Sequence, residues 1–168
     1  PCGTLFPYTT LFRSPVGPVT GKTLFAYHAE KIRNLQRRYA CVLPWYIMVS
    51  AANNEATRAF FRENEYFGLQ EEDVFFLTQR MVPCVDEEGA FILESPCRLA
   101  MNPNGHGGCI PAMVENGVIE DAGRRGVTYL SYFQVDNWAV QVADPYFIGY
   151  HALADGEMSS KNHRKNEA

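Results

Sequence analysis

The sequence predicts an α/β fold with a mainly parallel sheet, and two apolar runs are the basis of that prediction. Residues Cys41–Ser50 form a continuous apolar run bounded by polar residues, which is typical of a strand buried on both faces, as in a parallel sheet. A second strand is expected at Asp73–Thr78. Between them, Glu55–Glu63 is expected to be a helix that packs on the sheet.

Apolar residues at helical spacing predict a helix from Lys22 onward, and they are Leu24, Phe25, His28, Ile32 and Leu35. We expect His28 on this stripe to be a core-edge histidine rather than a ligand, since no acidic or cysteine partner lies nearby. The helix Glu55–Glu63 is expected to take Asn54 as its cap and to pack through Ala56, Ala59 and Phe60.

The second half of the chain alternates turns with short elements. A hairpin-like turn at Glu87–Gly89 predicts a small β-ribbon between Cys84–Val85 and Ala90–Glu94. Short helices are expected at Cys109–Asn116 and within Gly117–Gly126, and a longer one from Asp144-Pro145 to about Ala154. Residues Val127–Val135 form the strongest predicted strand, because they are rich in β-branched and aromatic side chains.

Composition narrows the class of protein. The 168 residues fit one domain, and a net charge of −4 gives no electrostatic footprint for nucleic acid. There is no apolar run of transmembrane length and no signal-peptide pattern. The five cysteines contain no Cys-x-x-Cys and indicate free thiols rather than a zinc site or a disulfide framework. We therefore expect a soluble cytoplasmic protein that binds neither nucleic acid nor a membrane.

The stretch Met101–Gly108 is the first candidate for a functional element. An Asn-Pro, an Asn-Gly and a Gly-Gly in eight residues argue against regular helix or strand. The loop leads into the predicted helix at Cys109, and such a helix start suits an anion or a nucleotide. It matches neither the P-loop nor the dinucleotide fingerprint. A plain turn remains the alternative.

Two polar residues follow predicted strands, at the edge where open α/β sheets place their ligands. Gln79 comes just after the second strand, and its primary amide can both donate to and accept from a nucleobase edge. Asp136 ends the strand predicted at Val127–Val135, where a carboxylate could hold a divalent cation that faces phosphates. A loop-fixing glutamine and a turn-forming aspartate are the alternatives.

Several motifs together resemble a known family. They are Gly17-Pro-Val-Thr-Gly-Lys-Thr-Leu-Phe25, Leu43-Pro-Trp-Tyr-Ile-Met48, Phe67-Gly68, Gln79…Pro83, Asn102-Pro-Asn-Gly-His-Gly-Gly108 and Val135-Asp-Asn137…Val142-Ala-Asp-Pro145. The chain resembles the eukaryotic-type UDP-sugar pyrophosphorylases, and within them the UDP-N-acetylglucosamine (UDP-N-acetylhexosamine) pyrophosphorylases. The resemblance implies a Rossmann-like, GT-A-like nucleotidyltransferase domain. It also implies uridylyl transfer from UTP to a sugar 1-phosphate with Mg²⁺, which gives a UDP-sugar and pyrophosphate.

The resemblance assigns roles to residues that the pattern had already singled out. It implies that Gln79 and Gly105 contact the uridine and that His106, where many relatives have Asn, touches the substrate. Asp136 matches the family's catalytic aspartate on the nucleotide and metal side. Because each of these residues follows a predicted strand or opens a helix, we expect Gln79, Gly105 and Asp136 to line one cleft at the carboxyl edge of the sheet.

The departures from the family suggest a partial domain. The family's glycine-rich loop and its Pro-Lys-Gly segment should precede Pro15, but residues 1–14 resemble neither and repeat Thr-Leu-Phe. The resemblance therefore divides the chain into a foreign segment 1–14, an incomplete UTP-binding domain 15–161 and a divergent polar tail 162–168. We expect residues 1–14 to make few core contacts and the chain by itself to lack turnover.

Three alternatives stay open at this point. The chain could be a catalytically inactive uridine-nucleotide-binding module, or part of a UDP-glucose or UDP-sugar pyrophosphorylase of broader specificity. It could also be a plain α/β domain whose glycines are structural.

Overall fold

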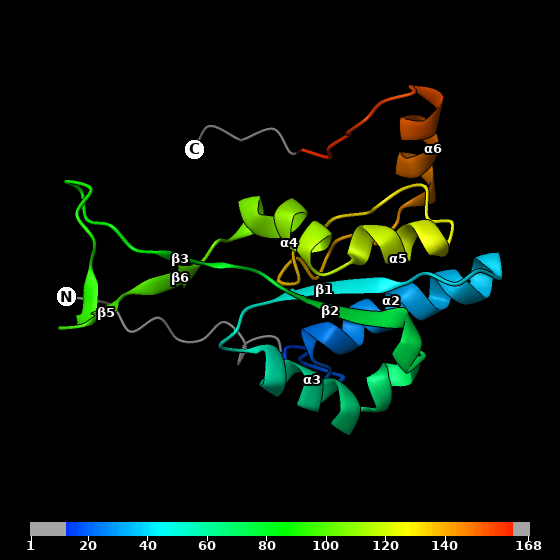
Figure 1. Ribbon diagram of the computed structural model, residues 1–168. Coiled ribbons are helices and arrows are strands. Elements are labelled where there is room, and N and C mark those ends of the chain that lie inside the picture. Colours follow the sequence, from blue (N-terminus) through cyan, green and yellow to red (C-terminus); the bar gives the residue numbers. More distant parts are fainter. Residues whose placement is uncertain (1–12, 163–168) are drawn as a thin grey trace, which may run out of the picture.

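The computed structural model describes residues 13–162, so the expectation for residues 1–14 lies almost wholly outside the described residues (Figure 1). The first half contains α2 (Leu24–Tyr39), β1 (Trp45–Val49), α3 (Asn54–Glu63), the 3₁₀ turns η1 (Glu65–Gly68) and η2 (Glu71–Asp73), and β2 (Val74–Thr78). The second half contains β3 (Met81–Pro83), β4 (Leu93–Ser95), β5 (Arg98–Leu99), β6 (Met101–Pro103), η3 (His106–Gly108), α4 (Cys109–Glu115), α5 (Val118–Arg124) and α6 (Pro145–Leu153).

The centre of the fold is a parallel pair of strands with helices on both faces. β1 and β2 pair in register from Trp45 opposite Val74 to Val49 opposite Thr78. In Figure 1, α2 and α3 lie on one side of this pair, and α4 and α5 lie on the other. Ile47 of β1 belongs to the core cluster on the α2 and α3 side, whereas Leu77 of β2 packs with α4 and α5. Coverage of both faces explains the continuous apolar run of β1 and confirms the predicted α/β fold with a parallel sheet.

The predicted helix at Lys22 is confirmed as α2. The Thr23 hydroxyl accepts a hydrogen bond from Ala26 N at 3.2 Å, which caps the first turn. Four of the five predicted apolar positions are buried, and only Leu35 is half-buried. The helix ends where Ala40 takes a left-handed backbone conformation.

The helix α3 is present, but its cap and its buried face differ from the prediction. The residue before the helix is Asn53, whose side chain accepts from Ser50 N at 2.8 Å, whereas Asn54 bonds to Arg58. Thr57 and Phe61 are buried and Ala56 is exposed, whereas the predicted Ala59 and Phe60 are half-buried and Phe60 packs against the core cluster.

Phe61 is the centre of an aromatic cluster. Its side chain is fully buried, and its ring lies 5.0–5.6 Å from the rings of Phe25, Trp45, Phe67 and Phe76. The edge-to-face angles of these pairs, between 62° and 88°, are the arrangement that aromatic quadrupoles favour. This cluster joins α2, α3, β1, β2 and η1 into one core.

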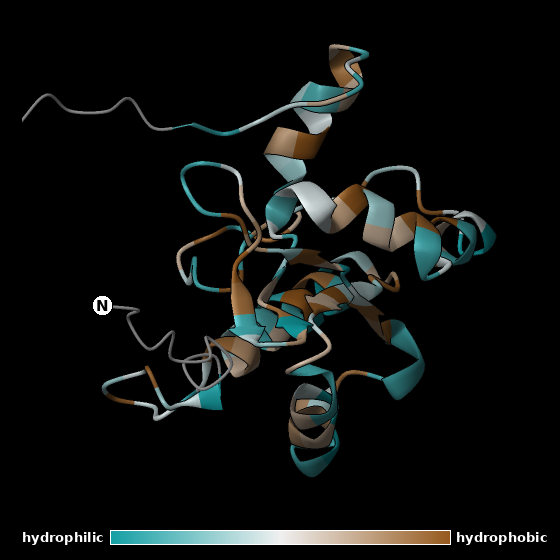
Figure 2. Cartoon of the chain, turned by 60° about the vertical axis from the view of Figure 1, so that its left-hand side comes forward, coloured by the Kyte–Doolittle hydropathy of each residue, from teal (hydrophilic) through white to brown (hydrophobic). Residues whose placement is uncertain are grey.

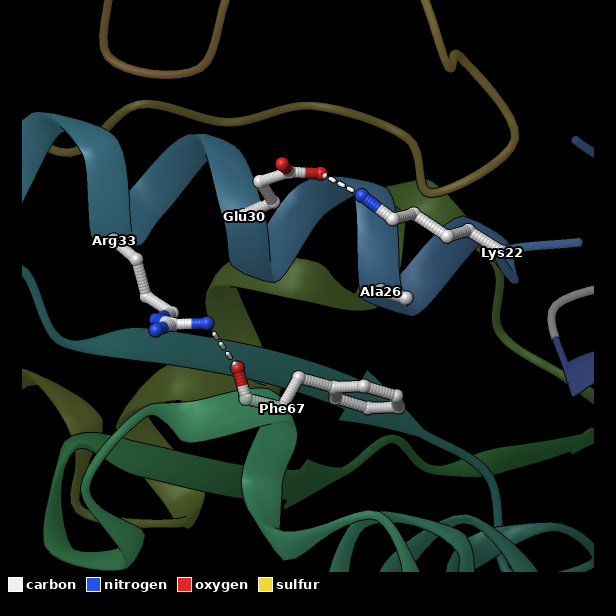
Figure 3. A pocket seen from close by; sticks show the side chains of 5 residues that line it. All are labelled: Lys22, Ala26, Glu30, Arg33 and Phe67. Carbon is white, nitrogen blue, oxygen red and sulfur yellow. Dashed lines mark hydrogen bonds and ion pairs between the residues drawn. The ribbon is translucent and has the colours of Figure 1, made fainter. Parts of the chain in front are cut away.

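The turn η1 is left-handed. Glu65, Tyr66 and Phe67 have φ angles of 49°, 49° and 54°, and Gly68 follows at 76°. Arg33 of α2 donates to the Phe67 carbonyl at 3.2 Å, and its guanidinium fills the space that a Cβ at residue 68 would need. A shallow pocket of about 230 Å³ lies beside this contact, lined by Lys22, Ala26, Glu30, Arg33 and Phe67 (Figure 3).

The predicted β-ribbon is confirmed. Asp86 forms its turn, since the carboxylate accepts from Glu88 N and Ala90 N and the Asp86 amide donates to the Ala90 carbonyl. β3 pairs with β6 and β4 with β5, both antiparallel. The expectation that Met101–Gly108 contains no regular structure is therefore wrong for its first three residues. Pro103 is tolerated because it lies at the end of its strand.

The predicted strand at Val127–Val135 is absent from the described structure. Its residues have no ladder partner, although Phe133 and Val135 pack against the core cluster around Phe61. A β-prone composition reports how well side chains pack on a half-buried surface, and it does not supply a hydrogen-bonding neighbour. Asp136 therefore follows an unpaired segment instead of a strand.

The helix α6 begins as predicted at Asp144-Pro145. The Asp144 carboxylate accepts from Tyr146 N at 3.1 Å and pairs with Lys161 at 2.5 Å. This helix carries exposed apolar residues at Tyr146, Tyr150 and Leu153, and it stands away from the body in Figure 2. Among the helices described, none is long and apolar enough to cross a membrane.

Candidate functional site

The loop that begins at Met101 folds back onto the carboxyl end of β2. Gln79 extends the pairing of β2 with β1 by one residue, since its backbone N–H donates to the Val49 carbonyl at 2.9 Å. Its side-chain Oε1 then accepts a hydrogen bond from Gly105 N at 2.8 Å. The structure therefore brings together Gln79 and Gly105, which the sequence analysis placed on one edge of the sheet.

The residue that follows α4 fixes the end of β2. Asn116 behaves like a strand neighbour: its Oδ1 accepts from Thr78 N and its Nδ2 donates to the Thr78 carbonyl, both at 3.1 Å. The same Nδ2 also donates to the Ala112 carbonyl at 2.8 Å. Because Thr78 directly precedes Gln79, Asn116 holds the backbone from which the Gln79 side chain projects.

The residue after Gln79 is also anchored to α4. The guanidinium of Arg80 meets the Glu115 carboxylate twice, with Nε at 2.9 Å and the second nitrogen at 2.8 Å. The Arg80 carbonyl accepts from Asn104 N at 3.0 Å. The sequence analysis missed Asn116 and Glu115, since an Asn and a Glu at the end of a short helix give no signal of such a contact.

Two of the three loop glycines are required by the backbone or by a close contact. Gly105 has φ 71° and ψ −157°, a combination essentially confined to glycine. A Cβ on the buried Gly108 would lie 2.8 Å from Asn104 Nδ2. Gly107 has neither constraint, since its φ lies outside the left-handed region and an added Cβ would meet nothing within 4 Å. The loop shape therefore depends on Gly105 and Gly108.

The loop itself uses several of the backbone donors at the helix start that was predicted to suit an anion or a nucleotide. Gly105 N bonds to Gln79, Gly108 N donates to the Gly105 carbonyl at 3.1 Å, and Cys109 N donates to the His106 carbonyl. The 3₁₀ turn η3 therefore provides acceptors for some of the backbone N–H groups at the start of α4. Fewer backbone donors are therefore left for an anion or a nucleotide than an uncapped helix start would offer.

His106 connects the loop to the unpaired segment 127–135. Its Nδ1 lies 2.6 Å from the Tyr132 hydroxyl and its Nε2 lies 3.1 Å from the Gln134 amide nitrogen. An amide nitrogen only donates, so Nε2 is the acceptor and Nδ1 carries the proton that faces Tyr132. Burial, together with the nearby Cys109, raises the pKa of the Tyr132 phenol. Tyr132 and Gln134 were not singled out by the sequence analysis.

Asp136 lies two residues beyond Gln134, on a turn. Its side chain is exposed, its carbonyl accepts from Trp138 N at 3.0 Å, and no hydrogen bond or ion pair engages its carboxylate within residues 13–162. No group of three or more His, Cys, Asp or Glu side chains suited to a metal ion occurs in the described part of the chain. Gln79, Gly105 and His106 are thus joined by direct contacts, and Asp136 is linked to them through the segment that His106 binds.

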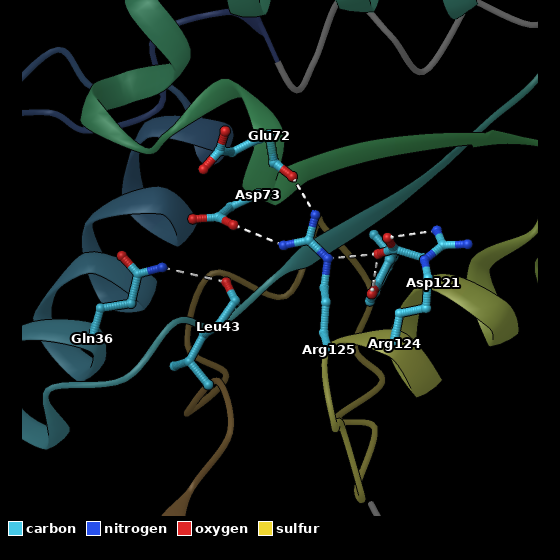
Figure 4. Close-up of polar contacts among 8 residues, drawn as sticks. Gln36, Leu43, Glu72, Asp73, Asp121, Arg124 and Arg125 are labelled. Carbon is cyan, nitrogen blue, oxygen red and sulfur yellow. Dashed lines mark hydrogen bonds and ion pairs between the residues drawn. The ribbon is translucent and has the colours of Figure 1, made fainter.

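The amino ends of the strands carry a different cluster, centred on Arg125 (Figure 4). Arg125 pairs with Asp73 and Asp121, both at 2.8 Å, and donates to the Glu72 carbonyl at 2.6 Å. Tyr46 donates to Asp121 at 2.8 Å, and burial and this bond raise the pKa of Tyr46 to about 12.

Asp121 within this cluster stays ionised. Burial opposes its charge, but hydrogen bonds from Tyr46 and Arg124 and the charge of Arg125 outweigh that and hold its pKa below the usual value. These carboxylates already have partners. The cluster therefore ties α5 to β1 and η2, and the candidate site lies at the opposite ends of the strands.

Comparison with known proteins decides the family. The family described as UTP–glucose-1-phosphate uridylyltransferase matches residues 14–166. The chain belongs to this uridylyltransferase family. A UDP-N-acetylhexosamine pyrophosphorylase-like protein 1 of Xenopus tropicalis is 44% identical over 152 residues, covering 87% of this chain and 30% of the relative. A probable UDP-N-acetylglucosamine pyrophosphorylase of Schizosaccharomyces pombe is 42% identical over 159 residues, covering 89% and 34%. The chain thus spans about a third of the length of these curated relatives.

Solved structures of the uridylyltransferase family agree with the fold. A putative UDP-N-acetylglucosamine pyrophosphorylase from Entamoeba histolytica superposes with a TM-score of 0.75 at 31% identity, covering 81% of this chain and 36% of that one. The Trypanosoma brucei uridine diphosphate N-acetylglucosamine pyrophosphorylase, in complex with an inhibitor, gives 0.75 at 31% identity, covering 86% and 32%. The resemblance and the nucleotidyltransferase fold expected from the sequence are confirmed.

Proposed function

We propose that this chain is the uridine-nucleotide-binding part of an enzyme that transfers UMP from UTP to an N-acetylhexosamine 1-phosphate, forming UDP-GlcNAc or a close analogue and releasing pyrophosphate. The observation that supports this most directly is the hydrogen bond between Gln79 and Gly105, the residues to which the resemblance assigns the uridine. The relatives named as UDP-N-acetylglucosamine pyrophosphorylases support the choice of sugar.

The fixed amide of Gln79 suits uracil. One lone pair of its Oε1 is used by Gly105 N, so a second lone pair and the Nε2 donors remain for a ligand. Uracil presents an N–H between two carbonyl groups, and a primary amide can accept from that N–H while it donates to a carbonyl. Cytosine reverses this pattern, since its ring nitrogen accepts and its amino group donates. Gln79 therefore selects uracil over cytosine in this proposal.

Asp136 would face the phosphates and hold Mg²⁺. Its carboxylate is exposed and has no partner within residues 13–162, and Mg²⁺ commonly binds one or two carboxylates together with substrate phosphates. The isolated carboxylate fits this mode, whereas an all-protein cage would need more ligands than residues 13–162 bring together. When bound, Mg²⁺ neutralises charge on the triphosphate and on the leaving pyrophosphate.

The reaction itself depends on placement. A phosphate oxygen of the sugar phosphate attacks the α-phosphorus of UTP, the bond to the β-phosphate oxygen breaks, and pyrophosphate leaves. This step needs alignment and charge stabilisation and no protein nucleophile. His106 is held by Tyr132 and Gln134 beside Gly105, and in this proposal it positions the substrate.

The proposal also covers the cellular setting. Cys41, Cys84, Cys97 and Cys109 are free thiols, which suits a reducing cytoplasm. The charge of −4 and the absence of a basic cluster in the sequence argue against a nucleic-acid or membrane partner.

A second candidate is a uridine-nucleotide-binding module without turnover. It is favoured by Gln141, which stands where the family often has a lysine just before Val-Ala-Asp-Pro. Losing a group that stabilises transition-state charge costs on the order of 10²–10³-fold in rate. In this reading the chain binds UTP but transfers no UMP.

Two assays separate these possibilities. Calorimetric titration of the purified chain with UTP and Mg²⁺ should show saturable binding, and an absence of binding contradicts both candidates. Because the chain by itself is expected to lack turnover, pyrophosphate release with UTP and N-acetylglucosamine 1-phosphate is measured on the enzyme of which this chain is a part, and it then distinguishes the transferase from the binding module. Glucose 1-phosphate in the same assay tests the broader specificity that some relatives of the family have.

A further inference from the structure

The turn that contains Asp136 is held by two side chains of α2. His28 Nε2 lies 2.8 Å from the Val135 carbonyl, directly before Asp136. Lys31 Nζ donates to the carbonyl of Trp138 and, at 3.0 Å, to that of Val140. His28 and Lys31 lie one helical turn apart on α2, so they hold both sides of the Asp136 turn from one rigid element.

The buried state of His28 defines its role in this contact. The side chain is fully buried, and Nδ1 is the buried side-chain polar atom among the described residues that has no hydrogen-bond partner. A carbonyl only accepts, so Nε2 carries the proton and Nδ1 keeps its lone pair. Burial, despite the bond to Val135, lowers the pKa of His28 and keeps the ring neutral.

A buried histidine with an unpaired ring nitrogen stabilises a core less than an apolar side chain does. An unpaired buried acceptor costs free energy that an apolar side chain of similar shape, also packed on Phe133, would avoid. The Lys31 ammonium is likewise partly desolvated, and burial lowers its pKa. Both residues direct their donors at backbone carbonyls of residues 135–140, and the geometry of that segment is what they determine.

We infer that His28 and Lys31 are positioning residues for Asp136, and that they orient its carboxylate toward the Mg²⁺–UTP complex without touching either. This inference rests on the proposed function of Asp136. It connects α2 to the phosphate side of the site. The resemblance assigned no contact with the nucleotide to any residue of α2. Neither residue is predicted to affect recognition of the base, which belongs to Gln79 and Gly105.

Binding measured with and without Mg²⁺ gives the required readout. UTP is titrated into the full 168-residue chain in the presence of Mg²⁺ and, separately, of a chelator. Asp136→Asn defines the effect of losing the carboxylate. His28→Leu removes the donor and keeps the apolar volume, while His28→Gln keeps a donor that can reach the Val135 carbonyl. Lys31→Met, with Lys22→Met as the charge-matched control, tests the second contact independently of the core.

Residues that orient a metal ligand without binding the metal typically contribute about 10- to 100-fold to metal affinity, and their replacement loses that factor. In the presence of Mg²⁺, the His28→Leu and Lys31→Met variants should bind UTP more weakly by a factor in that range. In the presence of the chelator, their affinity for UTP should equal that of the unmodified chain. His28→Gln should recover most of the Mg²⁺-dependent affinity, and Lys22→Met should match the unmodified chain. The double variant His28→Leu/Asp136→Asn should lose no more than Asp136→Asn alone, because both act through one carboxylate.

Other outcomes overturn the inference in distinguishable ways. If Asp136→Asn lowers the Mg²⁺-dependent affinity but His28→Leu and Lys31→Met change only thermal stability, the positioning role is wrong and the proposed function stands. If the His28→Leu variant does not fold, the Lys31→Met variant decides the question. Full Mg²⁺-dependent UTP affinity in the Lys31→Met variant would then show that the inference is wrong. If UTP binds the unmodified chain without any Mg²⁺ dependence, the proposed role of Asp136 fails and the inference fails with it.

Discussion

The Oε1 atom of Gln79 accepts a hydrogen bond from the backbone amide of Gly105 at 2.8 Å. This contact joins the end of β2 to a loop 26 residues further along the chain and fixes the plane of the amide. The orientation of the Gln79 side chain and the conformation of the loop therefore depend on each other.

Changing Gln79 to Glu tests the donor role of the amide. The carboxylate can still accept from Gly105 N, but it cannot donate to a uracil carbonyl. We expect UTP affinity to fall by about 5- to 150-fold, because a lost hydrogen bond with an unpaired partner costs about 1–3 kcal/mol. Calorimetry measures the effect, with the exposed Gln70→Glu as the charge-matched control. Equal affinities of the Gln79→Glu and Gln70→Glu variants would refute the assignment.

The glycine loop offers a matched pair of substitutions. Gly105→Ala should destabilise the chain by about 1–3 kcal/mol, since alanine cannot adopt its backbone angles without strain. Gly107→Ala should change the free energy of unfolding by less than about 0.5 kcal/mol, because an added Cβ meets nothing there. Urea unfolding of both variants measures the difference. A larger loss at Gly107 than at Gly105 would mean that the loop is folded differently.

The Arg125 cluster predicts where the fold is most sensitive to charge. Arg125→Met leaves the buried carboxylates of Asp73 and Asp121 without their main partner, so we expect a loss of about 3 kcal/mol. Arg98→Met removes an exposed pair with Glu94 and should cost less than about 1 kcal/mol. Equal losses in urea unfolding would show that the Arg125 cluster does not stabilise the fold as described.

Tyr46 predicts a specific loss of stability at alkaline pH. Its pKa in the folded chain is about 12, against 10.0 for an unperturbed tyrosine. Above pH 10 the unfolded chain releases this proton while the folded chain keeps it, so the contribution of Tyr46 is complete below pH 10 and is lost as the pH rises through about 12. Tyr46→Phe has no such proton and should lose less stability over this range. Parallel pH profiles of the two proteins would contradict the prediction.

The central layers of this fold follow from the sequence because they depend on local patterns. The apolar run around Ile47 and the helical stripe of α2 each specify a buried surface. The connection between β1 and β2, which contains α3, is long enough for the parallel pair that they form. These features require no knowledge of distant contacts.

The features that the sequence did not predict correctly have a common physical cause. The segment Val127–Val135 has the composition of a strand, but strand formation needs a neighbour with free backbone groups, and composition does not report one. The bonds of His28 to Val135 and of His106 to Tyr132 link residues 107 and 26 positions apart. Such pairings depend on the completed fold. The proximity of Gln79 and Gly105 could be predicted because each stands directly at the end or start of an element.

The account rests on one site at the carboxyl end of β2, and backbone and side-chain NMR of the chain during titration with UTP tests it most directly. We predict that UTP shifts the Gln79 side-chain amide and the Gly105 backbone amide together, with one dissociation constant, and that CTP at the same concentrations leaves both unchanged. Binding of UTP that leaves these two signals in place, or an equal response to CTP, would contradict the account.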